Sequence, residues 1–250
     1  MTFELETDAA ARRAAADAVA RDVVAPAAAG TDHAAEVPAS LRVAIRAIVP
    51  TAPAAASIDW VVALEALAVV SPTLALVAAG EALGAPAITT TAQWSGLRGA
   101  DVDGLRAALG ADPSWQLAVT ATIVGAGRAA MEAGVAALKV SRAAGVTGHT
   151  GQPLVADAAT AVDASRLLLW DAASQPLDAE ATRIARGLAR LHALDALTIA
   201  LTAAEQVCGS EAFRPGTPLE RLRRDGATVA QVLGDRVREA EAVAAGTFPV

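Results

Sequence analysis

The sequence predicts an all-α protein, and its composition supports that prediction in three ways. Hydrophobic residues make up 54% of the 250 residues and charged residues 19%, a balance typical of a chain that packs a core. Aromatic residues make up 3%, tyrosine is absent and alanine is abundant. Because aromatic and β-branched residues favour strands whereas alanine is the best helix former, this composition favours helices over sheets.

Start signals divide the chain into predicted helices. Ser71-Pro72, Asp112-Pro113 and Thr217-Pro218 each place an N-cap residue before a proline at the first helical position, where a missing N–H is tolerated. Glu220 completes a capping box with Thr217. With the apolar periodicity, these signals predict helices near residues 6–25, 38–48, 57–70, 72–83, 114–143, 154–174, 178–208 and 217–243, the last with a break near Asp225-Gly226.

Two of the predicted helices carry informative side-chain patterns. In 178–208, leucines recur at helical spacing, and Arg183, Arg186 and Arg190 are offset from them, so we expect these arginines on a solvated edge. In 114–143, the small residues Gly125, Gly127 and Gly134 are better explained by close packing against a neighbouring helix than by a dinucleotide fingerprint, because no strand precedes them.

The long helices predict two regions. Residues 113–250 are expected to form a four-helix bundle of antiparallel helices, and residues 1–112 a smaller helical region that ends in a linker. The linker, 84–112, lacks the alternation of a strand. Residues 145–153 are rich in glycine and predict a second loop.

Charge and cysteine content argue against several classes of partner and site. A net charge of −7 and a pI near 5.0 oppose attraction to nucleic acid and to anionic membranes. The most apolar stretch, 60–79, is interrupted by Glu65 and Pro72, so we expect buried helices there rather than a membrane span. The single cysteine, Cys208, favours a reducing, cytoplasmic location. No two histidines have ligand spacing, so no metal site is expected.

Several segments resemble the acyl-CoA dehydrogenase family. Residues 155–160 and 164–173 are similar to the family pattern L-A-D-M-A-T followed by A-A-R-L-L-V-Y-x-A-A. Residues 204–209 resemble A-V-Q-L-L-G, and residues 218–225 match P-x-E-R-x-x-R-D. The resemblance implies an acyl-CoA-dehydrogenase-like C-terminal bundle with a smaller N-terminal helical block.

The resemblance also shows what this chain lacks. The family places a β-domain of roughly a hundred residues, an ordinary domain size, where this chain has only 84–112. In the family that domain covers one face of the flavin, whose chemistry depends on being positioned and shielded. The two positions where family members carry the catalytic glutamate correspond here to Leu233 and Gln116, neither of which is a carboxylate base. The resemblance therefore implies that ordinary flavin-dependent acyl-CoA oxidation has been lost.

Candidate cofactor residues are those that the family motifs retain. Arg142 corresponds to the arginine of R-x-x-F-G, which in the family binds flavin pyrophosphate across a subunit interface, and Gln206 and Gly209 belong to Q-x-x-G-G. We expect no cofactor in this chain alone, and FAD only if it is shared with a partner subunit. The candidate catalytic residues are His149, in the glycine-rich loop, and Glu132, which could replace the missing base.

These observations leave two classes of function open. The first is a homo- or heteromeric subunit, whose heteromeric partner would be a full-length acyl-CoA dehydrogenase-like protein. A residual FAD-dependent dehydrogenase acting with such a partner is a variant of this class. The second is a repurposed flavin-free enzyme, of the cyclase, isomerase or lyase type, acting on a small, acyl or polyketide-like ligand.

Overall fold

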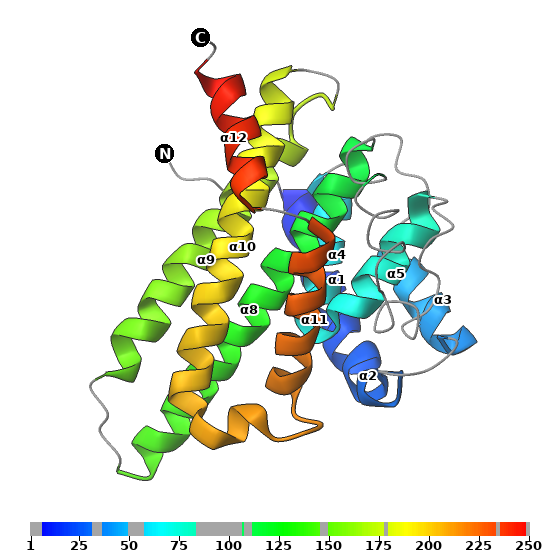
Figure 1. Ribbon diagram of the computed structural model, residues 1–250. Coiled ribbons are helices and arrows are strands. Elements are labelled where there is room, and N and C mark those ends of the chain that lie inside the picture. The colour runs from blue at the N-terminus through cyan, green and yellow to red at the C-terminus, as the bar shows by residue number, and fades with distance from the viewer. Residues whose placement is uncertain are drawn as a thin grey trace.

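Helices form the architecture of this protein in the computed structural model. The structure describes residues 7–31, 37–49, 58–83, 107, 112–145, 150–177, 180–233 and 236–248, and no strand occurs within these ranges. Figure 1 shows long helices inclined alongside one another, with shorter helices gathered against one end. The all-α prediction is therefore confirmed.

The helix bounds agree closely with the expected ones. The elements are α1 (Thr7–Val19), the π-helical turn η1 (Ala20–Val24), α2 (Ala25–Thr31), α3 (Ala39–Ile48), α4 (Ile58–Val70), α5 (Pro72–Leu83), α8 (Pro113–Ala143), α9 (Gly151–Ala173), α10 (Glu180–Cys208), the 3-10 turn η2 (Gly209–Phe213), α11 (Pro218–Leu233) and α12 (Arg236–Thr247). The predicted caps are present: the side chains of Ser71, Asp112 and Thr217 accept hydrogen bonds from the backbone N–H groups of Leu74, Ser114 and Glu220 at 3.3, 2.8 and 3.3 Å.

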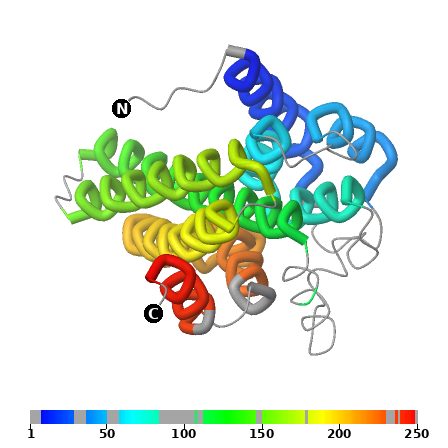
Figure 2. The backbone as a smooth tube through the Cα atoms, turned by 90° about the horizontal axis from the view of Figure 1, so that it is seen from above, coloured from blue at the N-terminus to red at the C-terminus, as the bar shows by residue number. Residues whose placement is uncertain are grey.

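The bundle is built from α8, α9 and α10, with α11 and α12 packed alongside them (Figures 1 and 2). Two sequence predictions about its ends were wrong. Helix α9 begins at Gly151, within the predicted loop 145–153, rather than after it. Pro153 is tolerated because it lies in the first turn of α9. No break occurs at Gly226, which lies within α11 against the side chain of Leu197; the helix instead ends at Leu233.

The small helices are held to the bundle by α4, which is buried around its whole circumference and is apolar there except for Glu65. Every residue from Trp60 to Ala68 is buried. The helix crosses α8 at Gly125, where a Cβ atom would lie 2.6 Å from the Cβ of Ala68, so the predicted close packing of α8 through small residues is confirmed. No described helix is both long enough and apolar enough to cross a membrane.

A single core runs across the predicted boundary between residues 112 and 113. It joins Trp60 and Leu67 of α4 to Leu117 and Ile123 of α8 and Leu169 of α9. The apolar area removed from water at this junction holds the two regions together. The division into regions 1–112 and 113–250 stays a prediction.

Candidate functional site

The first turn of α8 carries the residue that stands where some family members have their base. Gln116 follows the helix cap formed by Asp112, and its side-chain oxygen accepts a hydrogen bond from Nε of Arg186 on α10 at 3.2 Å. An amide has no proton-accepting form at neutral pH, and this one is engaged with a guanidinium. The second base position, Leu233, is the last residue of α11, and its side chain lies outside the described part of the structure.

Arg186 and Arg190 lie one turn apart on α10 and form a cationic pair beside Gln116. Arg186 is 5% exposed, and its Nη1 donates to the carbonyl oxygen of Leu177 at 2.9 Å. Arg190 forms an ion pair with Glu239 on α12. Burial, reinforced by the charge of Arg186, lowers the pKa of Arg190 to about 10. Burial, followed by the charge of Arg183, also lowers the pKa of Arg186.

This placement corrects the prediction that the arginines of α10 lie on a solvated edge. Arg183 is exposed, as expected, but Arg186 is buried while Leu188 is 42% exposed. The buried stripe of α10 consists mainly of alanines, and α12 covers the arginines, with Gly187 packed against Val243. The sequence does contain one signal for this site. Arg186 has no acidic residue three or four positions away, so its own helix offers it no ion pair.

A second charged cluster surrounds Glu65 at the junction of α4, α8 and α9. Glu65 is 1% exposed, and its Oε1 accepts a hydrogen bond from Nε of Arg166 at 2.7 Å. A terminal nitrogen of Arg128 lies 4.0 Å from the same oxygen and 3.1 Å from a carboxylate oxygen of Asp17. The charges in this cluster are matched, so it joins α1 and α4 to the bundle.

The predicted catalytic residue Glu132 lies at the outer edge of this second cluster. Its side chain is 49% exposed and pairs with Arg128 at 2.8 Å. The other catalytic candidate, His149, lies outside the described residues. Glu132 is accessible to solvent but is held by an arginine, and its catalytic role stays a prediction.

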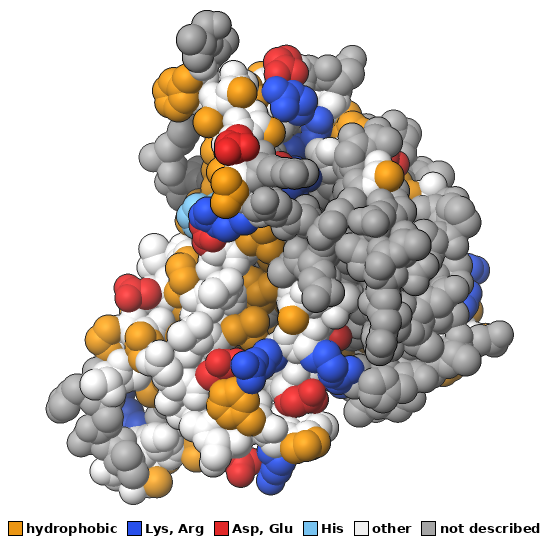
Figure 3. All heavy atoms as spheres, viewed as in Figure 1, with side chains coloured by type: hydrophobic (Ala, Val, Ile, Leu, Met, Phe, Trp, Pro, Cys, Tyr) orange, Lys and Arg blue, Asp and Glu red, His pale blue; other side chains and the backbone are white. Residues whose placement is uncertain are grey.

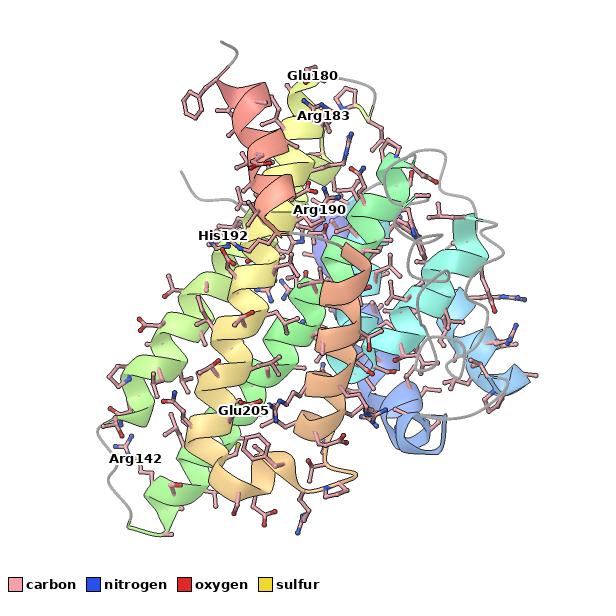
Figure 4. The ribbon with its side chains drawn as sticks, viewed as in Figure 1. Arg142, Glu180, Arg183, Arg190, His192 and Glu205 are labelled. Atoms are coloured by element: carbon pink, nitrogen blue, oxygen red, sulfur yellow. The ribbon has the colours of Figure 1, made fainter. Side chains whose placement is uncertain are left out.

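The three cofactor candidates lie near one end of the bundle. Arg142 is in the last turn of α8, Gln206 in the last turn of α10, and Gly209 begins η2; all three are exposed. The start of α9 packs against the ends of both α8 and α10. A Cβ at Gly151 would lie 2.7 Å from the side chain of Leu138 on α8 and 3.2 Å from that of Val207 on α10. Figure 4 shows Arg142 and Glu205 at this same end.

An open pocket of about 270 Å³ adjoins this end, between η2 and α11. It is lined by Ala212, Phe213, Glu220, Arg223, Arg224 and Ala227. The guanidinium of Arg223 lies 4.9 Å from the centre of the Phe213 ring and pairs with Glu205 at 3.2 Å. On the side of α11 facing α5, Asp225 accepts a hydrogen bond from Thr73 at 3.1 Å, which ties the two helices together.

A serine and a histidine also meet between α9 and α10. Oγ of Ser165 lies 2.8 Å from Nδ1 of His192 and donates to the carbonyl oxygen of Ala161 at 2.8 Å. Ser165 is completely buried, so the pair joins two helices and offers no accessible nucleophile.

The helical scaffold and the retained motifs define a protein of the acyl-CoA dehydrogenase type. The family model for the acyl-CoA dehydrogenase C-terminal domain matches residues 103–242. The chain therefore belongs to the acyl-CoA dehydrogenase family, and it lacks a β-domain throughout the part that the structure describes.

Solved structures share the fold at low sequence identity. A glutaryl-coenzyme A dehydrogenase in complex with glutaryl-CoA is 14% identical, with a TM-score of 0.77 over 99% of this chain and 96% of that chain. An electron transferring flavoprotein of Acidaminococcus fermentans is 14% identical, with a TM-score of 0.75 over 100% of both chains. The butyryl-CoA dehydrogenase of Megasphaera elsdenii is 13% identical, with a TM-score of 0.73 over 99% of this chain and 100% of that chain. None of the curated proteins matches the sequence.

Proposed function

We propose that this protein is a non-oxidising subunit of the acyl-CoA dehydrogenase family, which acts in a homo- or heteromeric assembly. The observation that carries the proposal is the state of the base position: Gln116 is an amide whose oxygen is bound to Arg186. Abstraction of a proton next to a thioester carbonyl requires a positioned base with a suitable pKa, and an amide cannot supply it.

The outward surface of α9 and α10 supports a role in assembly. Leu167 and Ile199 are each 42% exposed, and Thr198 and Thr202 near Ile199 are exposed and uncharged, whereas Asp163, one turn from Leu167, is exposed and paired with Arg166. Figure 3 shows mostly uncharged atoms over the middle of α10. An exposed aliphatic side chain among uncharged neighbours, as at Ile199, is suited to contact with another subunit.

The retained motif residues favour contact with a flavin-bearing partner over complete loss of cofactor contact. Arg142, Gln206 and Gly209 are exposed, so they are free to reach a neighbouring subunit. The resemblance implies that these positions serve a cofactor across an interface. A heteromer would keep them in use even though this chain has no base of its own.

The test is to purify the protein alone and together with a co-expressed full-length relative. We expect a colourless protein that does not reduce flavin with acyl-CoA thioesters and that elutes as an oligomer in size-exclusion chromatography with light scattering. The variant Ile199→Glu should dissociate it. Val43→Glu is the matched control, since Val43 is 69% exposed on α3, away from this surface.

Two results would contradict the proposal. One is tightly bound flavin that acyl-CoA reduces in the protein purified alone. The other is a monomer that does not associate with the relative, which would favour the flavin-free enzyme instead.

A further inference from the structure

Arg186 is a buried cation whose hydrogen-bond acceptors are both neutral. The residue is 5% exposed, and it donates to the amide oxygen of Gln116 and to the carbonyl oxygen of Leu177. Within the described ranges no carboxylate lies within ion-pair distance of it, and its Nη2 has no acceptor. Burying a charge without an opposite charge is costly, so a protein that keeps such a group gains something else from it.

A second cation adjoins the first. Arg190 follows Arg186 by four positions, so the two side chains lie on the same face of α10. Glu239 is the carboxylate that pairs with Arg190, and Nε of Arg190 is buried without an acceptor. Within the described ranges, the two guanidinium groups therefore share one carboxylate, and those residues leave the pair with one positive charge in excess.

The start of α8 adds to this positive character. Gln116 lies in the first turn of α8, at the positive end of the helix dipole. The nearest acid on that helix, Asp112, uses its carboxylate to cap the helix at Ser114. It is therefore committed to the backbone rather than to Arg186.

We propose that Arg186 and Arg190, together with Gln116, form a binding site for the oxyanion group of a small-molecule ligand, a carboxylate or a phosphate. A guanidinium presents its N–H groups in a planar fork that matches both groups; Nη2 of Arg186 is the donor left for the ligand, and Arg190, whose Nε is inaccessible to solvent, contributes its charge. The bound oxyanion would supply a negative charge that the described residues around Arg186 do not provide. This site is separate from the assembly surface and does not depend on the proposed function.

The experiment measures thermal unfolding of the full chain in phosphate, acetate or chloride at one ionic strength. At a tenfold excess over its Kd, a ligand that binds only the folded state raises the Tm by about 4 °C for a chain of this size. We expect that rise in wild type for phosphate, acetate or both, relative to chloride, and its loss in Arg186→Gln. Arg183→Gln is the matched control, because Arg183 lies one turn away, is exposed and pairs with Glu180. The control should respond like wild type.

Two further measurements, one on Arg186→Gln without ligand and one on Gln116→Glu, separate a binding site from a structural contact. Arg186→Gln without ligand should melt at or above the wild-type temperature, because it removes a buried charge that no acid compensates. Gln116→Glu should raise the Tm and abolish the response to phosphate and acetate, because it places a carboxylate beside Arg186. The proposal is overturned if neither anion shifts the Tm of wild type, if Arg186→Gln responds like wild type, or if Arg186→Gln is strongly destabilised or unfolded.

Discussion

Two clusters of buried arginine contact α8, and they differ in the charges that face them. Around Glu65, the side chains of Arg166 and Arg128 share a fully buried carboxylate, and Asp17 adds a second. Around Gln116, the described residues offer Arg186 an amide and a carbonyl oxygen but no carboxylate, and they offer Arg190 Glu239. The comparison teaches that a compensated cluster holds helices together, whereas a cluster with excess charge is suited to bind a ligand.

The largest expected effect is the loss of the carboxylate at the centre of the compensated cluster. Glu65→Gln removes the buried carboxylate from Arg166, whose side chain is 12% exposed and is then paired only with the exposed Asp163. We expect the free energy of unfolding to fall by about 3 kcal/mol, as urea denaturation would measure. Glu132→Gln is the control at the exposed edge of the same cluster and should change it by about 0.5 kcal/mol or less. If the two variants lowered the free energy of unfolding equally, the burial of Glu65 would not explain its contribution.

A smaller loss of unfolding free energy is expected from a substitution that moves α4, which carries Glu65, away from α8. Gly125→Ala places a Cβ against the carbonyl oxygen of Glu65 and 2.6 Å from Ala68, so α4 must shift away from α8. We expect a loss of about 2 kcal/mol in unfolding free energy.

Gly127 is the matched control for Gly125 on the same helix. A Cβ there would lie 3.4 Å from Val162, an ordinary contact. Gly127→Ala should therefore leave stability unchanged or raise it by up to about 1 kcal/mol through helix propensity. A Gly125→Ala protein as stable as Gly127→Ala would mean that the α4–α8 contact is not tight.

The smallest effect is expected at an exposed ion pair, which extends the comparison to a third environment. Arg236 of α12 donates to Asp195 of α10 at 2.8 Å, and both side chains are largely exposed. This hydrogen bond lowers the pKa of Asp195 below its ordinary value of 3.8. The stabilisation is therefore complete above that ordinary value and is lost as the pH falls through the lower pKa of the folded state.

Asp195→Asn tests this contact directly. At neutral pH it should lower the unfolding free energy by less than about 1 kcal/mol, and 1 M salt should remove most of the difference. The difference in Tm between wild type and variant should also shrink as the pH is lowered toward and below 3.8. A difference that persists unchanged in acid and in salt would indicate a contribution other than the ion pair.

Local features of the sequence were sufficient to predict most of the fold. Ser71, Asp112 and Thr217 mark helix starts through bonds that span two or three residues, so no knowledge of tertiary structure is needed. Gly226 was misread as a break because packing against Leu197 outweighs the low helix propensity of glycine.

Sequence reasoning placed some residues of the candidate sites and misplaced others, because it uses features that are local along the chain. The resemblance predicts Gln116 as the changed base position, and this stays a prediction; the periodicity placed Arg186 in solvent, which was wrong. The partners that bury and bind the arginines lie far along the chain: Gln116 is 70 residues from Arg186, and Glu239 is 49 residues from Arg190. A pattern confined to one helix cannot detect such contacts.

The enclosure of α4 has a consequence for how the chain is made. Its apolar circumference is covered largely by α8, so during synthesis α4 leaves the ribosome well before the segment that will enclose it. At about 5–20 residues per second, the interval between the synthesis of α4 and that of α8 lasts several seconds. During this time the exposed apolar segment can bind chaperones or aggregate. Slower translation across the linker would prolong this exposure, and synonymous codon changes there should alter the yield of folded protein.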